Sequence, residues 1–257
     1  MSKLIFTGTS SGYPSKTRAC SSFVIKHNNK LYQFDAGEGF SRSAMMHRIA
    51  TDNIAKIFIS HLHPDHIAGL FLELQKMYLD NRSQPLDIYV PKEEIDGLSK
   101  TVDMFYLFKE KFPFKFRFKP IEPGPIYNGN KICVNAYPTA HLYPNYKLIR
   151  KYHKPNKMAS YSFEIEISTK TIFYSGDLRT ENEIADLMSG IDIAIVEGMH
   201  IDAETLFYLA NHHKIKKLIL THLPDKIANN PKRLQNIAEK YGIKRLVIAV
   251  DGMAINL

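Results

Sequence analysis

The residues best suited to chemistry lie in one short stretch, His61-Leu-His-Pro-Asp-His66, directly after a β-rich run. Neutral imidazole and carboxylate groups are ligands for zinc, and also for manganese or iron. His61 and His63 are two residues apart and can face one pocket. Asp65 and His66 open a predicted helix over 67–79 and can reach a second ion. A polar loop rich in histidine is the alternative that this spacing alone leaves open.

Three later residues could complete such a site. His141 follows a predicted strand, Asp177 follows the run Ile172-Phe-Tyr-Ser-Gly, and His222 follows Leu218-Ile-Leu-Thr. Each therefore stands at the carboxyl end of a strand, where a rigid sheet can hold it. Any one of them alone would be an ordinary strand-end residue. Four such strand ends in one chain favour a metal site.

The order of these motifs resembles the metallo-β-lactamase superfamily over most of the chain. The resemblance implies an α+β (α/β) fold, the four-layer αββα sandwich, in one domain over residues 1–257. It also implies two divalent ions, with Zn²⁺ favoured and Mn²⁺ or Fe²⁺ also compatible. The implied metal ligands are His61, His63 and His141 for one ion, Asp65, His66 and His222 for the other, and Asp177 as a bridge between them.

The resemblance gives the two ions a catalytic role. Zinc lowers the pKa of bound water to about 7, so a metal-bound hydroxide would be available at neutral pH. Asp65 would help to orient that hydroxide. Asp35, in Phe34-Asp-Ala-Gly-Glu-Gly39, would support the ligands through a hydrogen bond to a metal-bound histidine. The residues of this stretch also favour a turn, and the stretch can form a turn and support the metal ligands at once.

Three features favour the ribonuclease Z branch of the superfamily. The run Gly8 to Arg18 resembles the Pro-x-Lys-x-Arg loop of transfer-RNA 3′-processing enzymes, so Lys16 and Arg18 would bind backbone phosphates. A surface loop with two solvated charges is the alternative. A Walker loop is rejected because the Gly-Lys-Ser/Thr ending is absent. The phrase Phe34 to Gly39 also matches that branch closely.

A third feature is Val196-Glu-Gly-Met-His200. In the ribonuclease Z branch, a glutamate and a histidine in this stretch assist the leaving group. His200 would therefore donate a proton and Glu197 would orient it, since an imidazole beside a carboxylate can protonate a leaving alkoxide. The alternative is that His200 is a surface residue at a helix N-terminus.

The chain also departs from ribonuclease Z. Only residues 142–176 separate His141 from Asp177, and two predicted strands use much of this length. What remains is a short basic loop over 147–157 in place of the long arm that grips transfer RNA. The short loop favours a small cyclic or nucleoside phosphodiester, whereas the Lys16 and Arg18 loop favours RNA. A nucleic-acid-binding module with a structural metal is a rival from another class. Structural zinc sites are typically rich in cysteine, which argues for catalysis here.

Composition agrees with a polyanionic substrate. The chain has 257 residues, a formal net charge of +8 and 44% hydrophobic residues. These values suit one large domain and a partner such as RNA or another phosphodiester. No run approaches a membrane span of roughly 18 apolar residues, and no signal-peptide layout is seen, so we expect no membrane partner. Cys20 and Cys133 fit a reduced cytoplasmic setting and structural roles. Homodimers are common in the family, and the sequence leaves the oligomeric state of this chain open.

The pattern of hydrophobic residues predicts two β-rich halves, each ending in helices. We expect a helix from Pro91 through Lys111 and a turn-rich connector over 120–130. The alternation of cations and phenylalanines over 109–119 predicts a strand with a solvated edge, and a basic stripe for nucleic acid is the alternative. The remaining expected strands are 3–7, 21–26, 30–34, 55–60, 86–90, 132–137, 161–167, 171–174, 192–196, 218–221 and 246–250, and the remaining helices begin at 181, 204 and 231.

Overall fold

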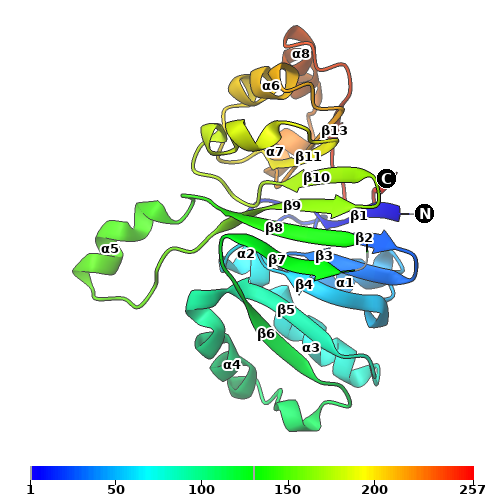
Figure 1. The fold of residues 1–257 in the computed structure, drawn as a ribbon, viewed down its shortest axis with the longest axis vertical. Helices are drawn as coiled ribbons and strands as arrows, with labels where there is room; N and C mark the ends of the chain where they lie inside the picture. Colours follow the sequence, from blue (N-terminus) through cyan, green and yellow to red (C-terminus); the bar gives the residue numbers. More distant parts are fainter. Residues whose placement is uncertain (1, 130) are drawn as a thin grey trace. The chain divides into compact units, whose positions relative to one another are not determined.

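The computed structural model describes residues 2–129 and 131–257. The chain divides into two compact units, Met1–Ile121 with Val250–Leu257, and Glu122–Ala249 (Figure 1). Each unit contains one seven-stranded sheet, which confirms the two predicted β-rich halves. The single domain over 1–257 stays a prediction.

The sheet of the first unit has the order β14-β1-β2-β3-β4-β5-β6. Strands β3 to β6 are parallel neighbours, so the carboxyl ends of β3 and β4 meet at one edge. Asp35 follows β3 and Ser60 lies just after β4 at that edge. The strands are β1 Ser2–Gly8, β2 Ser22–His27, β3 Lys30–Phe34, β4 Ile54–Phe58, β5 Leu86–Pro91, β6 Phe116–Ile121 and β14 Ala254–Asn256.

Helices of the first unit hold the end of β3 in place. Its helices are α1 Phe40–Met46, α2 Pro64–Ile67, α3 Gly69–Leu79 and α4 Ile95–Met104, with 3₁₀ turns η1 Thr51–Asn53, η2 Lys92–Glu94 and η3 Lys109–Lys111. The amide of Gly69 donates to the carbonyl of Ala36. A Cβ on Gly69 would lie 2.1 Å from the carbonyl oxygen of Gly37, so only glycine allows this approach. The start of α3 is thereby packed onto the turn that carries Asp35.

The sheet of the second unit has the order β13-β12-β11-β10-β9-β8-β7. Strands β10 to β13 are parallel, so the carboxyl ends of β10, β11 and β12 share one edge. Asp177, Glu197 and His222 lie at those ends. The strands are β7 Gly124–Gly129, β8 Ile132–Pro138, β9 Tyr161–Ile167, β10 Lys170–Tyr174, β11 Ile193–Glu197, β12 Lys217–Thr221 and β13 Leu246–Ile248.

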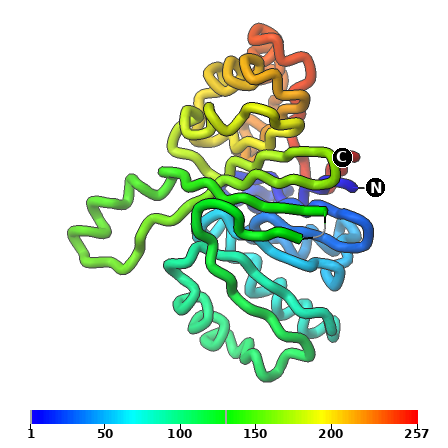
Figure 2. Tube along the Cα trace, viewed as in Figure 1, coloured from blue at the N-terminus to red at the C-terminus, as the bar shows by residue number. Residues whose placement is uncertain are grey.

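One helical segment stands clear of the sheet of the second unit (Figure 2). It consists of η4 Tyr143–Asn145 and α5 Tyr146–Lys151, so the predicted basic loop over 147–157 includes a helix. The other helices are η5 Glu181–Met188, α6 Ala203–His212, α7 Asp225–Ala228 and α8 Lys232–Lys240. Within the described residues, every helix is too short or too polar to cross a lipid bilayer.

Three secondary-structure predictions are wrong. The helix over 91–111 breaks after α4, because Tyr106 takes a left-handed φ of 60° and the amide of Leu107 closes the turn on the carbonyl of Val102. The strand over 109–119 begins only at Phe116, after a 3₁₀ turn. The connector over 120–130 contains β7, which pairs with β8. Asn130, the last residue of that connector, lies outside the described residues.

Arg82 is the largest fully buried side chain of the first unit. Its guanidinium donates to five carbonyl oxygens, those of Thr51, Asp52, Ile54, Gln84 and Pro85. Because these contacts flank the start of β4 and precede β5, Arg82 fixes both strands at their amino ends. Burial lowers the pKa of its guanidinium. Nothing in the sequence marks this arginine as buried.

A buried carboxyl group lies beside the same sheet. Glu73 on α3 is fully buried, and the side-chain amide of Gln33 donates to its Oε2 at 2.9 Å. The same amide also donates to the backbone carbonyl of Asp35. Burial raises the pKa of Glu73 to about 8. Glu73 is therefore a neutral acid at pH 7, because ionisation inside the core would be costly.

This raised pKa predicts a pH-dependent loss of stability. Between pH 5 and 8 the unfolded chain ionises Glu73 while the folded chain keeps it neutral, so stability falls as pH rises through this range. Glu73→Gln should abolish that fall, with a gain over the wild type on the order of a few kcal/mol at pH 8 and little difference at pH 5. Urea unfolding at pH 5 and pH 8 measures these differences in the free energy of unfolding. Glu239→Gln, on the exposed face of α8, is the control. If the free energy of unfolding changed with pH in the same way in all three proteins, Glu73 would not be a neutral buried acid.

Candidate metal and catalytic site

Asp35 organises the polar cluster of the first unit. It is fully buried and has a left-handed φ of 56°. Its Oδ1 accepts the amide of Ser60 at 2.7 Å, and its Oδ2 accepts the hydroxyl of Ser60 at 2.9 Å. The Nδ1 of His66 lies 2.8 Å from the same Oδ2. With its proton on Nδ1, His66 presents the lone pair of Nε2, which is the arrangement that metal-binding histidines use.

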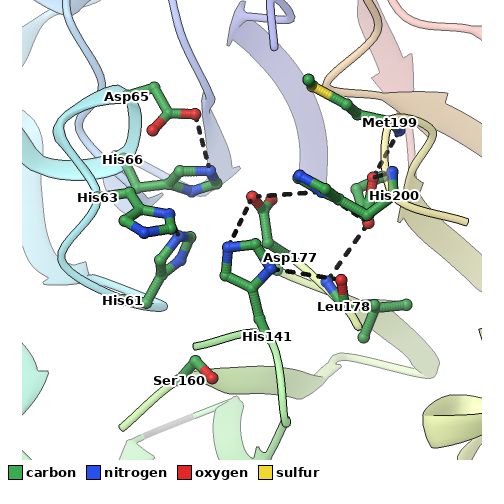
Figure 3. A network of polar contacts seen from close by, with 12 residues as sticks. His61, His63, Asp65, His66, His141, Ser160, Asp177, Leu178, Met199 and His200 are labelled. Atoms are coloured by element: carbon green, nitrogen blue, oxygen red, sulfur yellow. Dashed lines mark hydrogen bonds and ion pairs between the residues drawn. The ribbon is translucent and has the colours of Figure 1, made fainter. Parts of the chain in front are cut away.

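The predicted ligands of the first unit lie together around His66. Its Nε2 is 3.5 Å from Oδ2 of Asp65, and Nε2 of His61 is 3.1 Å from Nδ1 of His63 (Figure 3). His61 and His66 are fully buried. His63 precedes α2, whose first residue is Pro64, and the helix carries Asp65 and His66. The structure thus brings together all four residues of the motif.

Asp177 occupies the corresponding position in the second unit. Gly176, with a left-handed φ of 55°, turns the chain after β10 and places Asp177 at the sheet edge. Its Oδ2 is 3.6 Å from Nε2 of His141 and 3.4 Å from Nε2 of His222. The Nδ1 of His141 lies 3.3 Å from the carbonyl oxygen of Leu178, which favours the tautomer that leaves Nε2 as a ligand. His222 also has a left-handed φ, of 56°.

The distances within each cluster fit a shared cation. Zinc binds nitrogen and oxygen ligands at about 2.0–2.1 Å in a tetrahedron, so two ligand atoms of one ion lie roughly 3.4 Å apart. The pairs Asp65–His66, Asp177–His141 and Asp177–His222 measure 3.5, 3.6 and 3.4 Å. These separations are long for hydrogen bonds between a carboxylate and an imidazole. The donor set is therefore suited to a divalent metal in both units.

Glu197 is held by backbone amides. It is 1% exposed, its Oε2 accepts the amides of Met199 and His200 at 2.6 and 2.9 Å, and its Oε1 accepts the amide of Leu178 at 3.4 Å. Nδ1 of His200 lies 3.2 Å from Oε1 of Glu197 and 3.8 Å from Oδ2 of Asp177. The imidazole of His200 is 34% exposed. Glu197 and His200 thus lie beside Asp177, with the ring open to solvent.

Two supporting residues were missed by sequence reasoning. The hydroxyl of Ser60 bonds Asp35 and also lies 3.1 Å from Nδ1 of His61, but a serine after a strand carries no distinctive signal. Glu183 accepts the amide of Ala140 at 2.7 Å and those of Arg179 and Thr180 at 2.9 Å. Glu183 therefore ties the residue before His141 to the turn after Asp177. The Thr180-x-x-Glu183 capping box is the signal that could have found it.

The loop with the predicted phosphate-binding residues passes beside Asp65. A Cβ on Gly12 would lie 3.2 Å from Oδ2 of Asp65, so this position suits glycine. Lys16 is exposed on the same loop. Arg18 donates from Nη1 to the carbonyl of Thr9 at 2.8 Å, so part of its guanidinium braces the loop.

Asp251 anchors both ends of this loop. Its Oδ1 accepts the hydroxyl of Thr9 at 2.7 Å and its Oδ2 accepts the amide of Ala19 at 2.7 Å. Burial raises the pKa of Asp251 above its ordinary value. The neighbouring Cys20 is a free thiol whose pKa is raised to about 11 by burial, so it stays protonated and inert. Cys133 is also free.

Comparison with known proteins gives a family match. Residues 2–239 match the family model described as anti-Pycsar protein Apyc1. Ribonuclease Z of Methanosarcina mazei is 24% identical over 305 positions, covering 100% of this chain and 98% of that protein. Ribonuclease Z of Methanococcus aeolicus is 36% identical over 155 residues, covering 59% of this chain and 47% of that protein. In this last match, the chain spans about half the length of its relative.

Solved structures give the fold. The metallo-β-lactamase fold protein YhfI from Bacillus subtilis has a TM-score of 0.79 at 18% identity, with 100% of both chains covered. The short form of human tRNase Z has a TM-score of 0.76 at 22% identity, covering 99% of this chain and 98% of that chain.

These likenesses confirm the predicted metallo-β-lactamase fold and the predicted resemblance to ribonuclease Z. The predicted class of enzyme, a metal-dependent hydrolase of phosphodiester bonds, agrees with the names of these relatives. Because the family match extends over both polar clusters, the chain belongs to the family of the anti-Pycsar protein Apyc1.

Proposed function

We propose that this protein cleaves phosphodiester bonds with two divalent metal ions, Zn²⁺ foremost. The observation that carries the proposal is the His61–His66 motif with Asp35 orienting it, in a chain whose relatives are named ribonuclease Z. The proposed ligand sets are His61, His63, His141 and Asp177 for one ion, and Asp65, His66, Asp177 and His222 for the other.

Bound divalent ions would supply charge neutralisation at the phosphate and activation of the attacking water. The side chains determine how those ions and the substrate are held. Asp35 and the carbonyl of Leu178 keep the proton of His66 and of His141 on Nδ1, which directs each Nε2 toward a ligand position. Asp65, on the same helix as His66, would also orient the attacking water.

His200 is the proposed proton donor to the leaving oxygen. Glu197 accepts from Nδ1 of His200, so the transferable proton sits on Nε2 at the other side of the ring. The four contacts to Glu197, three of them from backbone amides, hold its side chain in one orientation. Glu197 thereby fixes the ring of His200 beside Asp177.

RNA is one substrate class that fits. Lys16 and Arg18 lie on the loop beside Asp65, where they would bind phosphates of the substrate backbone. The arm α5 adds exposed aromatic and basic groups: the rings of Tyr143 and Tyr146 stack with centroids 5.6 Å apart, and Arg150 donates to the hydroxyl of Tyr146. Exposed aromatic rings and cations are the groups with which proteins contact the bases and phosphates of single-stranded RNA.

A small cyclic or nucleoside phosphodiester is the second candidate. The alignment with the M. mazei ribonuclease Z runs over 305 positions, against 257 residues in this chain, so that relative carries insertions that this chain lacks. The α5 arm has only six helical residues, which gives little surface for a large RNA.

We further propose a cytoplasmic location, consistent with two free cysteines, and the homodimer stays a prediction.

Removal of metal should abolish activity. A chelator should stop hydrolysis of bis(p-nitrophenyl) phosphate, and added Zn²⁺ or Mn²⁺ should restore it. Asp177→Ala should lower kcat by about 100-fold or more, because it removes the ligand shared by both ions. His212→Ala, on the exposed face of α6, is the control and should retain activity. Full turnover after complete metal removal would contradict the proposal.

Leaving-group chemistry tests His200. His200→Ala should lower kcat by roughly 100-fold or more for a dinucleotide, whose leaving alkoxide needs a proton. The same variant should cut bis(p-nitrophenyl) phosphate at close to the wild-type rate, because p-nitrophenolate leaves without one. His213→Ala is the matched control. An equal loss on both substrates would show that His200 does not donate the proton.

The choice of substrate is tested by comparing the two substrates in separate reactions. Wild-type enzyme is given a precursor transfer RNA in one reaction and a 3′,5′-cyclic nucleotide in another, and kcat/KM is compared. Lys16→Ala should raise KM for RNA more than for the cyclic nucleotide, since it would contact backbone phosphates that the small substrate lacks. Cleavage of the cyclic nucleotide alone would reject the RNA assignment while leaving phosphodiester hydrolysis intact.

A further inference from the structure

A basic hollow of about 320 Å³ lies on the second unit, apart from the residues described above. We define it by four cations, Lys214, Lys216, Lys244 and Arg245, together with an apolar floor that includes Ile215 and Leu218. Its lining contains no acidic residue. The hollow is at the lower end of the size range of small-molecule sites.

The basic hollow is far from the candidate catalytic residues of the same unit. It lies where β12 and β13 begin, next to Lys217 and Leu246. His222 follows the opposite end of β12. A strand of five residues rises roughly 16 Å. The hollow is therefore a separate site at the amino ends of the parallel strands.

The charges of the basic hollow are only partly neutralised. Lys216 pairs with Asp192, with Nζ and Oδ1 2.6 Å apart, and this contact lowers the pKa of Asp192. Across residues 2–129 and 131–257, Lys214, Lys244 and Arg245 form no ion pair with a carboxylate. Three cations gathered at one hollow repel one another, and a bound anion would offset that repulsion.

Ordered backbone turns bring these cations together. Helices α6 and α8 lie side by side in the second unit (Figure 1). Each ends in a left-handed turn, at Lys214 with φ 56° and at Gly242 with φ 78°. The amides of Lys214 and Gly242 close these turns on the carbonyls of Asn211 and Glu239. Positive charge is favourable near the carboxyl end of a helix, which explains the basic residues at these two helix ends. This effect does not explain the apolar floor between the basic residues.

We propose that the basic hollow binds an organic phosphate of the nucleoside phosphate class. Lys214, Lys244 and the planar guanidinium of Arg245 would hold the phosphate oxygens, since arginine binds phosphate through two parallel hydrogen bonds. The floor at Ile215 and Leu218 would contact the base or the sugar. This proposal is independent of the catalytic proposal, because it uses none of the same residues.

Calorimetric titration of the metal-loaded protein tests the basic hollow with two probes, adenosine monophosphate and inorganic phosphate. Neither probe contains a phosphodiester bond. The double variant Lys244→Ala/Arg245→Ala should weaken binding of adenosine monophosphate at least tenfold, because two charge-assisted contacts are lost. The matched control, Lys232→Ala/Lys240→Ala, removes the same net charge from exposed positions of α8 outside the hollow. It should bind the probe as the wild type does.

The other outcomes are equally informative. Tighter binding of adenosine monophosphate than of inorganic phosphate supports a contribution of the apolar floor, whereas equal binding of the two probes overturns the nucleoside part of the proposal. Equal affinity of the double variant and the control for adenosine monophosphate overturns the site itself. Hydrolysis of bis(p-nitrophenyl) phosphate should be unchanged in both variants, so failure of this site is distinguishable from failure of the catalytic proposal.

Discussion

A buried carboxylate at the end of a parallel strand is the constraint on which the rest of the structure depends. Asp35 has no access to solvent, so its charge must be balanced by hydrogen bonds inside the protein. Ser60 and His66 provide them, which joins the end of β4 and helix α2 to the end of β3. The close approach of Gly69 to Gly37 keeps this arrangement compact. The imidazole of His66 is thereby set in place by hydrogen bonds within the first unit.

The second unit also buries a carboxylate at the end of a parallel strand, and different groups form hydrogen bonds with it. Glu197 is buried at the end of β11 and is balanced mainly by backbone amides, two of them from the turn that carries His200. Asp177 follows β10 and faces His141 and His222. In both units, left-handed residues end the strands: Asp35 in one and His222 in the other. Strain of this kind persists where surrounding contacts over-determine the backbone, as functional sites often do.

The sequence alone predicts that the motif residues follow strands, and it predicts most of the strands. His61 to His66, Asp177 and His222 stand after apolar runs whose β character is unmistakable, and the structure places them at sheet edges. The break after α4 was not predictable, because it depends on a left-handed Tyr106, which propensity does not reveal. Strand β7 was hidden by glycine and proline, and is stabilised by its pairing with β8. Ser60, Glu183 and Arg82 act through tertiary hydrogen bonds, which leave no local pattern.

Anomalous X-ray diffraction at the zinc edge, from crystals grown with Zn²⁺, tests the central claim most directly. The account predicts two zinc peaks per chain, with His61 and His63 bound to one, Asp65 and His66 bound to the other, and Asp177 in contact with both. A single peak held by the His61–His66 motif without Asp177, or no peak at all, would contradict it.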